Sequence, residues 1–519
     1  MSRLTRRQFI GRTALIAGTL PMIAWDDACQ RANVTTSMLE KFRKSIDGDV
    51  LYPIDPGYWE RTVVWNARFQ HAPMMFVLPA NEADVQKAIQ FSKSNGIRLS
   101  PRGGGHNYCG WSTCDGMVID FRNMAHINVE SDASVAHIGP GALLFDMYQK
   151  LWCDAQCSLP GGTCPTVGLA GFTLGGGFGL YSRAWGLMCD RLIEVRAVTA
   201  DGDLITANAN NEHSDLFKAC RGGGGGSLCI VTEFIYEPIQ VDTTSFGRVT
   251  LSNFSAAADF LDAYQNFGPH ADPKLGVVMS LGTRPGNPNG ARAGMASVAI
   301  GDGQEWDHLM KPFLDKLVKK GVPHHVTTPS ESNPAQIAIT YARSNSDPQW
   351  MSCESDVPDA EHFEKTTRCK PSSVYLNEPL TSSGVDTFVS AISDRQNDST
   401  FTNSASISMD CYGGQIAHEP EGGSVMYHRE AMAVSQLFTG GWEQNAPADY
   451  VQRNIDWLDD TRTQLANVST NGAYVNYCDD AIEDWETAYW GPRYPFLQQV
   501  KLAYDSNDVF RFPQSIRLP

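Results

Sequence analysis

Residues 101–108 of the chain read PRGGGHNY, and they hold the first of three glycine clusters. The other two lie at 175–179 (GGGFG) and 222–226 (GGGGG), each beside short apolar stretches. Glycine lets a backbone approach a ligand closely, and successive N–H groups in such loops form concavities that suit a pyrophosphate. One cluster alone is more typical of a flexible surface loop, whereas three predict a dinucleotide site. None has the strand–GxGxxG–helix context of a Rossmann unit, which disfavours NAD on that fold.

The segments around the first cluster carry strand and helix signals. Residues 75–78 (MFVL) are typical of a strand, and Asn81 is a suitable cap for an amphipathic helix that ends at Gly96. Residues 97–100 (IRLS) then predict a strand that leads into the glycine loop. Farther on, residues 201–202 (DG) stand between two apolar stretches and predict a hairpin turn.

Length and charge bound the class of protein. A chain of 519 residues can hold two or three domains. Residues 1–12 contain four arginines and no acid, so the remainder carries a formal charge of −17 − 4 = −21. A surface that acidic repels phosphate backbones, and we expect no nucleic-acid partner. No apolar stretch after the N-terminus is long enough to predict a membrane span, and no metal site is expected.

Residues 1–28 resemble an export signal. Arg6 and Arg7 precede an apolar run over 14–24 that is too short to cross a bilayer, and the arginine pair is typical of twin-arginine export of folded proteins. The alternative is a basic tail that runs into a buried helix. The chain has 13 cysteines, many for a cytosolic enzyme, and a periplasmic or secreted protein could oxidise some of them. The odd number leaves at least one unpaired or chemically used.

Five motifs, in order along the chain, resemble one family. Beyond residues 101–108, they are Arg221 with its glycine run and the stretches at 162–168 (GTCPTVG), 474–477 (YVNY), and 504–510 with 513–516 (YDSNDVF, PQSI). Together they are similar to the berberine-bridge-enzyme and glucooligosaccharide-oxidase family of FAD-linked oxidases, which has the vanillyl-alcohol-oxidase type of FAD-binding fold. The resemblance covers nearly the whole chain after residue 55.

The resemblance implies a two-domain α+β fold. Residues 29–240 and 471–519 would form the FAD-binding domain. Residues 241–470 would form a substrate domain built on an antiparallel sheet. The active site would lie where the two domains meet, as ligand sites commonly do.

The resemblance also implies FAD attached through two bonds. His106 would bond through an imidazole nitrogen to the flavin 8α-methyl carbon, and Cys164 through sulfur to flavin C6, because imidazole and thiolate are the available nucleophiles. Taken singly, His106 could be a structural loop histidine, and Cys164 an inert thiol or half of a disulfide. The other residues expected to bind the cofactor are Arg102, Gly103, Gly104, Gly105, Asn107, Val167, Gly168, Gly171, Gly175, Gly176, Gly179, Ile230, Tyr474 and Asn476.

Oxidation of a hydroxyl group needs a base, and three residues are candidates. In oligosaccharide oxidases of this family an aspartate and the motif tyrosine act together, which implies Asp410 and Tyr477 here. Tyr108, two residues after the attachment histidine, is the third. A tyrosine with a pKa near 10 is a poor base alone. The alternatives are loop packing for Tyr108 and a surface strand position for Asp410.

The implied reaction is oxidation of a hydroxyl group of a carbohydrate or other alcohol, with O₂ reduced to H₂O₂. Val167, three residues after Cys164, matches the family position at which valine goes with oxygen reactivity and leucine with its loss; a well-packed core valine is the alternative. Strand alternation places Ser406, Ser408 and Asp410 on one face. The two serines lack the larger groups of known sugar oxidases, so a natural-product tailoring oxidase remains an alternative. A flavin-bearing binding protein without activity is the third possibility.

Overall fold

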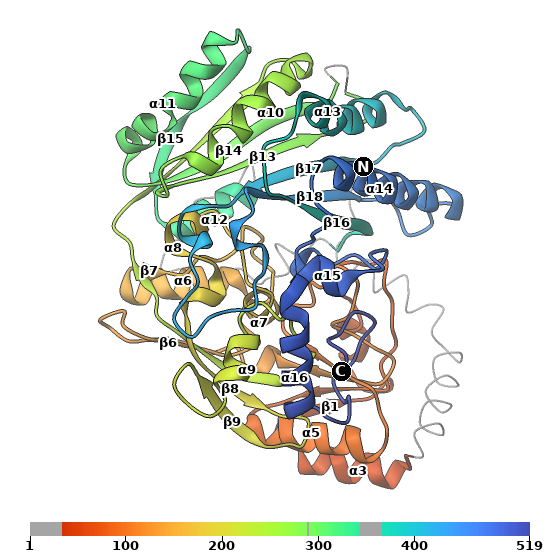
Figure 1. Ribbon diagram of the computed structural model, residues 1–519. Helices are drawn as coiled ribbons and strands as arrows, with labels where there is room; N and C mark the ends of the chain where they lie inside the picture. The colour runs from red at the N-terminus through yellow and green to blue at the C-terminus, as the bar shows by residue number, and fades with distance from the viewer. Residues whose placement is uncertain (1–33, 288–289, 343–365) are drawn as a thin grey trace.

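The computed structural model describes residues 34–287, 290–342 and 366–519. The expected export signal at 1–28 lies outside this part of the chain. The chain forms two halves (Figure 1): one carries sheets of four and five strands, a two-stranded sheet of β7 (Cys157–Ser158) and β11 (Ile239–Gln240), and the C-terminus, and the other carries a large sheet. Within the described residues, no helix is both long and apolar enough to cross a membrane.

The first sheet has the strand order β1-β2-β4-β3, and its last three strands are parallel. The strands are β1 (Asp49–Leu51), β2 (Met75–Leu78), β3 (Leu99–Arg102) and β4 (Met117–Asp120). Helix α5 (Glu82–Ser94) connects β2 to β3, and the side chain of Asn81 caps it by accepting a hydrogen bond from the Asp84 N–H. The predicted strand at 75–78 and the predicted helix after Asn81 are both confirmed.

The predicted strand at 97–100 begins two residues later, at Leu99. The backbone N–H of Ile97 donates to the Ser92 carbonyl at 2.9 Å and so closes the end of α5. Gly96 makes this turn possible with a φ of 61°. The strand therefore starts only after the helix cap is complete, and it delivers the chain to the glycine loop at 103–105.

The second sheet has the order β5-β6-β10-β8-β9. Its strands are β5 (Ile127–Val129), β6 (Ala136–Ile138), β8 (Leu192–Val198), β9 (Leu204–Asn208) and β10 (Ile230–Tyr236). Strands β8 and β9 form the predicted hairpin, with Gly202 at a φ of 88°. Helices α6 (Leu144–Ala155), α7 (Leu169–Leu174) and α9 (Ser214–Ala219) contribute buried side chains to the core beside this sheet.

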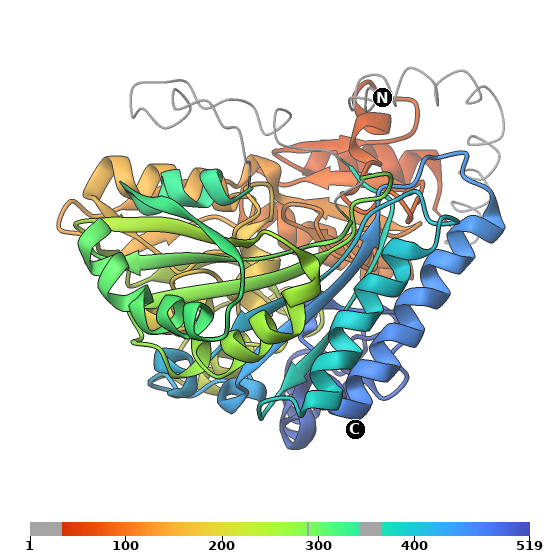
Figure 2. The same cartoon turned by 90° about the horizontal axis from the view of Figure 1, so that it is seen from above.

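The large sheet is antiparallel, in the order β15-β12-β14-β13-β17-β18-β16. Its strands are β12 (Thr244–Leu251), β13 (Leu275–Gly282), β14 (Arg292–Ile300), β15 (His324–Ser332), β16 (Cys369–Leu376), β17 (Ala405–Cys411) and β18 (Ala433–Gly440). Helices α10 (Ala257–Gln265), α11 (Gly303–Lys319), α13 (Ser382–Asn397) and α14 (Ala448–Val468) cover one face, and Figure 2 shows them along the outside of the sheet. The antiparallel sheet and the mixed α and β content confirm the expected fold class.

The C-terminal segment returns to the first half. Helix α16 (Tyr494–Tyr504) packs beside α9, and helix α15 (Trp485–Trp490) packs beside α16 (Figure 1). The Trp490 indole donates to the carbonyl of Gly222 at 2.9 Å, and the buried Lys501 ammonium donates to that of Ser227, also at 2.9 Å. The end of the chain thus holds the third glycine cluster in place.

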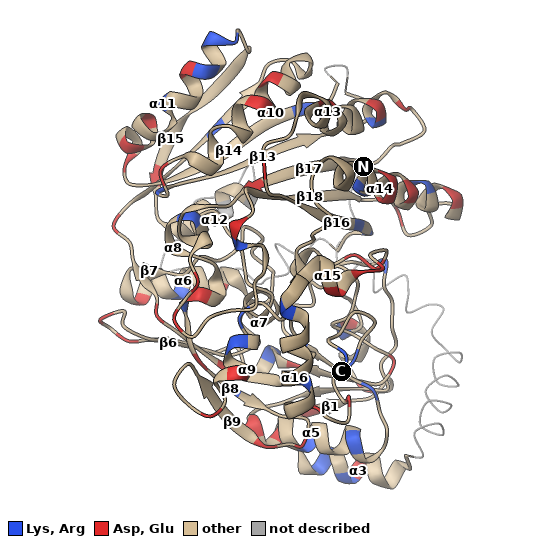
Figure 3. Ribbon diagram, viewed as in Figure 1, with Lys and Arg blue, Asp and Glu red and all other residues tan. Residues whose placement is uncertain are grey.

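Charged side chains concentrate on outer helices such as α3 (Thr36–Ser45), α5, α11 and α14 (Figure 3).

Candidate active site

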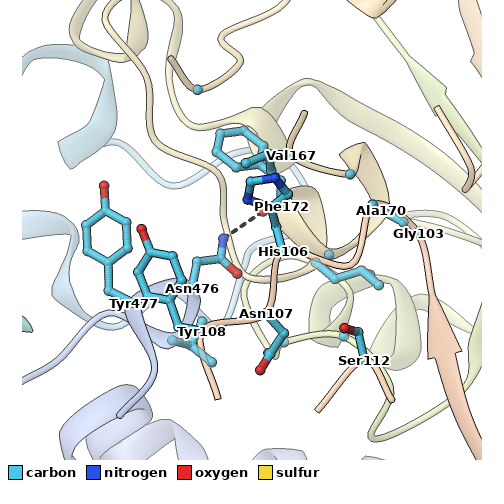
Figure 4. Close-up of a pocket in the computed structure, with 18 of the residues that line it drawn as sticks. Gly103, His106, Asn107, Tyr108, Ser112, Val167, Ala170, Phe172, Asn476 and Tyr477 are labelled. Atoms are coloured by element: carbon cyan, nitrogen blue, oxygen red, sulfur yellow. Dashed lines mark hydrogen bonds between the residues drawn. The ribbon is translucent and has the colours of Figure 1, made fainter. Parts of the chain in front are cut away.

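A cavity of about 400 Å³ lies where strands β17 and β18 face the loops of the first half. Its walls come from segments far apart in sequence: the first glycine loop, the stretch from 162 to 171, the third glycine cluster and the motif at 474–477. Figure 4 shows side chains from three of these segments around one space: the first glycine loop, the stretch from 162 to 171 and the motif at 474–477. The cavity therefore joins the sequence motifs that were predicted to act together.

Both predicted attachment residues line this cavity. The His106 ring stacks on Trp65 at a centroid distance of 5.0 Å, and its Nε2 lies 2.7 Å from the Thr166 hydroxyl oxygen. The same oxygen lies 3.7 Å from Sγ of Cys164. Burial lowers the pKa of His106 to about 3, so its imidazole is neutral at pH 7. A neutral imidazole keeps the lone pair that a nucleophile needs.

The glycines make the cavity fit a dinucleotide. A Cβ on Gly104 would lie 2.3 Å from the Gly168 nitrogen, so the two attachment loops can touch only without side chains. A Cβ on Gly171 would meet no atom within 4 Å, and since Gly171 lines the cavity, a side chain there would project into the space. Gly224 and Gly226 have φ values of 82° and 77°, which favour glycine. This bare backbone is suited to a ligand that approaches along its N–H groups.

Most of the residues expected to bind the cofactor line the cavity, with three exceptions. Arg102 is buried below the loop, where its guanidinium donates to the backbone carbonyls of Arg61 and Ser112. Gly175 makes room for the Asn476 side chain, because a Cβ there would lie 2.0 Å from Asn476 Oδ1. Gly176 packs in the same way against Met426. The structure thus places Arg102, Gly175 and Gly176 behind the cavity wall, where they support the loops that form it.

Other residues expected to bind the cofactor line the cavity, but their polar atoms form hydrogen bonds within the protein. Asn107 Oδ1 accepts from the N–H groups of Cys109 and Trp111, each at 3.0 Å, and so folds its own loop. The Tyr474 hydroxyl accepts from the N–H of Gly177 and from the Asn476 amide. The Asn476 amide also donates to the Phe172 carbonyl at 2.9 Å (Figure 4). These bonds connect the C-terminal motif to α7 and to the loop that follows it.

The three candidate bases meet at one wall of the cavity. The Tyr108 and Tyr477 rings stack at 5.8 Å with planes 10° apart, and Figure 4 shows them side by side. The Tyr477 hydroxyl lies 3.5 Å from Asp410 Oδ2. Burial raises the pKa of Asp410 to about 7, although the Tyr477 hydrogen bond opposes this shift. Burial also raises the pKa of both tyrosines. Asp410 is consequently the group of the three that can change protonation near neutral pH.

Sequence reasoning missed Gln436, which lies on β18. Its amide donates to the Tyr108 hydroxyl at 2.6 Å and lines the cavity. Gln436 pairs with Ser408 of β17, in register with the face that carries Asp410. An amide within the mainly apolar stretch AVSQLF was the signal that could have identified it. The cavity wall also includes Phe178, which belongs to the second glycine cluster, and Trp65, Val278 and Tyr341, for which no motif gave a signal.

The chain matches two family descriptions: "FAD binding domain" over residues 73–208 and "Berberine and berberine like" over residues 473–517. It is 31% identical over 481 residues to the uncharacterized FAD-linked oxidoreductase YgaK of Bacillus subtilis (strain 168), covering 91% of this chain and 98% of that one. It is 26% identical to a chitooligosaccharide oxidase of Gibberella zeae, covering 88% and 90%. Among solved structures, wild-type BBE-like 1 of Physcomitrella patens superposes with a TM-score of 0.80 at 27% identity, covering 93% of this chain and 99% of that one.

Proposed function

Because the chain belongs to the berberine-bridge-enzyme-like family of FAD-linked oxidoreductases, we propose that it oxidises a hydroxyl group with bicovalently bound FAD. The donor is a carbohydrate or another alcohol, and oxygen is reduced to hydrogen peroxide. One observation carries the proposal. His106 and Cys164 line the same cavity as the Asp410–Tyr477 pair, although these residues are far apart in the chain.

Residues of the first half hold the cofactor. The backbone of the glycine loops at 103–105 and 223–226 faces the cavity and binds the pyrophosphate. His106 and Cys164 attach the isoalloxazine ring at two points. When bound, the flavin supplies a two-electron acceptor for the hydride that leaves the carbon atom bearing the hydroxyl group.

Asp410 is the proton acceptor of the reaction. As a carboxylate, it accepts the proton of the substrate hydroxyl group, either directly or through the Tyr477 hydroxyl, which lies 3.5 Å from Asp410 Oδ2. Tyr477 alone is too weak a base, because burial raises its pKa further. The Gln436 amide holds the Tyr108 hydroxyl in place by a hydrogen bond. The Tyr108 ring stacks on Tyr477, and its hydroxyl group orients the substrate. Trp65, Phe178 and Tyr341 make this part of the cavity apolar and exclude water.

The covalent attachment is tested by acid precipitation. The wild-type protein should retain its flavin in the precipitate and show a fluorescent band on a denaturing gel. His106→Ala and Cys164→Ala should each retain flavin through the remaining bond, and the double variant should release it. Free FAD in the supernatant of the wild-type protein would overturn this part of the proposal.

The substrate class is tested by peroxide release. Oligosaccharides, small alcohols and aromatic secondary-metabolite alcohols should be compared at equal concentration, with anaerobic bleaching of the flavin as the second readout. Turnover of an oligosaccharide would support a carbohydrate as the substrate. Turnover of the secondary-metabolite alcohols alone would instead assign a natural-product tailoring oxidase, which the small Ser406 and Ser408 side chains on the Asp410 face would accommodate. Absence of bleaching by every class would leave a flavin-bearing binding protein.

We propose further that the protein is exported as a folded holoprotein through the twin-arginine signal at its N-terminus. Arg6→Lys combined with Arg7→Lys should leave a full-length precursor in the cytoplasm. Normal accumulation of that double variant outside the cytoplasm would show that another route reads the segment.

A further inference from the structure

The hydroxyl group of Thr166 lies between the two attachment residues. Its oxygen is 2.7 Å from Nε2 of His106 and 3.7 Å from Sγ of Cys164. Thr166 is buried, with 3% of its surface exposed, and its carbonyl oxygen packs against the first glycine loop, 3.0 Å from where a Cβ of Gly104 would stand. The side chain therefore has little freedom to turn away from either neighbour.

The two nitrogens of the His106 ring have different surroundings. Nε2 contacts the Thr166 hydroxyl, while Nδ1 has no hydrogen-bond partner among the described residues. The ring stacks on Trp65 with planes 23° apart, which limits rotation about its side-chain bonds. Because the ring lines the cavity, the nitrogen without a protein partner is the one available to a ligand.

The hydrogen bond to Thr166 decides which nitrogen carries the proton. If Nδ1 carried it, that N–H would face the cavity without an acceptor in the protein, and the lone pair would lie on Nε2, beside Thr166. If Nε2 carries it, that N–H donates to the Thr166 oxygen and Nδ1 keeps its lone pair. The hydroxyl proton of Thr166 then remains free to point toward the Cys164 sulfur.

We propose that Thr166 is a positioning residue for covalent flavin attachment, which orients His106 so that Nδ1 attacks the flavin and which donates its hydroxyl proton toward the Cys164 sulfur. This inference rests on the bicovalent attachment proposed above. Thr166 itself forms no bond to the cofactor.

The chemistry of each attachment balances with oxygen as the oxidant. At His106, Nδ1 bonds to the 8α carbon, one C–H bond of that methyl group breaks, and the ring becomes cationic until its Nε2 proton leaves. As the acceptor at Nε2–H, Thr166 stabilises this cation. At Cys164, a sulfur–carbon bond replaces one S–H and one C–H bond. In both cases two electrons and two protons pass to O₂, so one H₂O₂ forms for each bond.

The test compares Thr166→Val, which keeps the shape and removes the hydroxyl, with Thr166→Ser, which restores it. Proteins produced under identical conditions are incubated with excess FAD, and flavin-bearing peptides containing His106 or Cys164 are quantified by mass over time. We expect the histidyl bond to form about tenfold more slowly in Thr166→Val, as for the loss of one hydrogen bond, and Thr166→Ser to restore the rate. The bond to Cys164 should slow less, because its contact is longer.

Thr461→Val is the matched control. It removes another buried threonine hydroxyl, which lies outside the cavity wall and, among the described residues, bonds only to the Trp457 carbonyl within α14. Its attachment rates should equal those of the wild-type protein. Equal wild-type and Thr166→Val rates would overturn the inference, as would an equal loss of both bonds in Thr166→Val without rescue by serine, since that pattern indicates a collapsed loop. If the wild-type protein carries no covalent flavin at all, the proposed function fails instead.

Discussion

The Tyr477 hydroxyl lies 3.5 Å from Oδ2 of Asp410, so the C-terminal motif and strand β17 meet at one wall of the cavity. The two residues belong to different halves of the fold. A tyrosine is a poor base alone, and a buried carboxylate with a pKa of about 7 is a good one at neutral pH. Their contact therefore places a titratable carboxyl group from one half beside a tyrosine hydroxyl group from the other.

Removal of either member of this pair should slow flavin reduction. Tyr477→Phe keeps the ring stack on Tyr108 and removes the hydroxyl, while Asp410→Asn keeps the size and removes the base. Loss of a general base reduces the rate by about 10²–10⁴. Anaerobic stopped-flow measures the reduction rate with FAD still bound. Tyr427→Phe and Asp386→Asn, both on exposed residues, serve as controls. Unchanged reduction in both cavity variants would remove the pair from the mechanism.

The reduction rate should rise with pH through about 7. Burial raises the pKa of Asp410 from its usual value of 3.8 to about 7, so the carboxyl group is protonated and inactive below that pH. It is ionised and able to accept a proton above it, and the rate should level off by about pH 8. The profile of rate against pH should lose this inflection in Asp410→Asn. A wild-type profile that stays flat from pH 5 to 9 contradicts the assignment.

Gln436 and Tyr108 should act as one unit. The Gln436 amide donates to the Tyr108 hydroxyl at 2.6 Å. Gln436→Leu and Tyr108→Phe should each reduce kcat/KM by about tenfold, the equivalent of one hydrogen bond. The double variant should be little worse than either single variant, because both remove the same interaction. Multiplying effects in the double variant would mean that the two side chains act separately.

Val167 should control the reaction of the reduced enzyme with oxygen. It lines the cavity three residues after Cys164. Leucine is one methylene larger and would narrow the space available to a small molecule. Val167→Leu should slow reoxidation in air-saturated buffer, measured by stopped-flow, while flavin reduction stays unchanged. Slow reoxidation of the wild-type enzyme, together with fast turnover on an artificial dye, would indicate a dehydrogenase.

Lys370 should stabilise the segment that follows Tyr477. Its side chain is 2% exposed, and its ammonium group contacts Asp479, with Asp480 and Asp459 at 3.0 and 3.2 Å. Lys370→Met leaves carboxylates without their cation, and breaking a buried ion pair costs about 3–5 kcal/mol. The Tm should fall by several degrees in a thermal-shift assay. Lys274→Met breaks an exposed pair with Glu305 and should change the Tm little. Equal Tm values for both variants would contradict this role.

Local sequence patterns were sufficient for the elements near the glycine loop. The strand at 75–78, the helix capped by Asn81 and the hairpin at 201–202 are as predicted, because caps, turn residues and apolar periodicity act over a few residues. The start of β3 was misplaced by two residues. The helix end there uses the Ile97 N–H, a bond that strand periodicity does not reveal.

For the candidate site, too, the sequence predicted some features and missed others. The sequence by itself predicted His106, Cys164, Asp410 and Tyr477 as site residues, since their motifs resemble those of one family, and all four line one cavity. It gave no sign that the Thr166 hydroxyl lies within 3.7 Å of both attachment residues. It also placed Arg102 with the cofactor, whereas packing turns that side chain toward two backbone carbonyls behind the wall.

The sequence determined where the motifs and the candidate residues of this protein stand along the chain, and the tertiary structure decided which of them meet. The partner of Tyr108 is Gln436, 328 residues away, and the partner of Tyr477 is Asp410, 67 residues away. Such contacts depend on how the large sheet faces the loops of the first half across the cavity. Local propensity fixes only the conformation of each segment, so the pairing of side chains follows from packing over the whole chain.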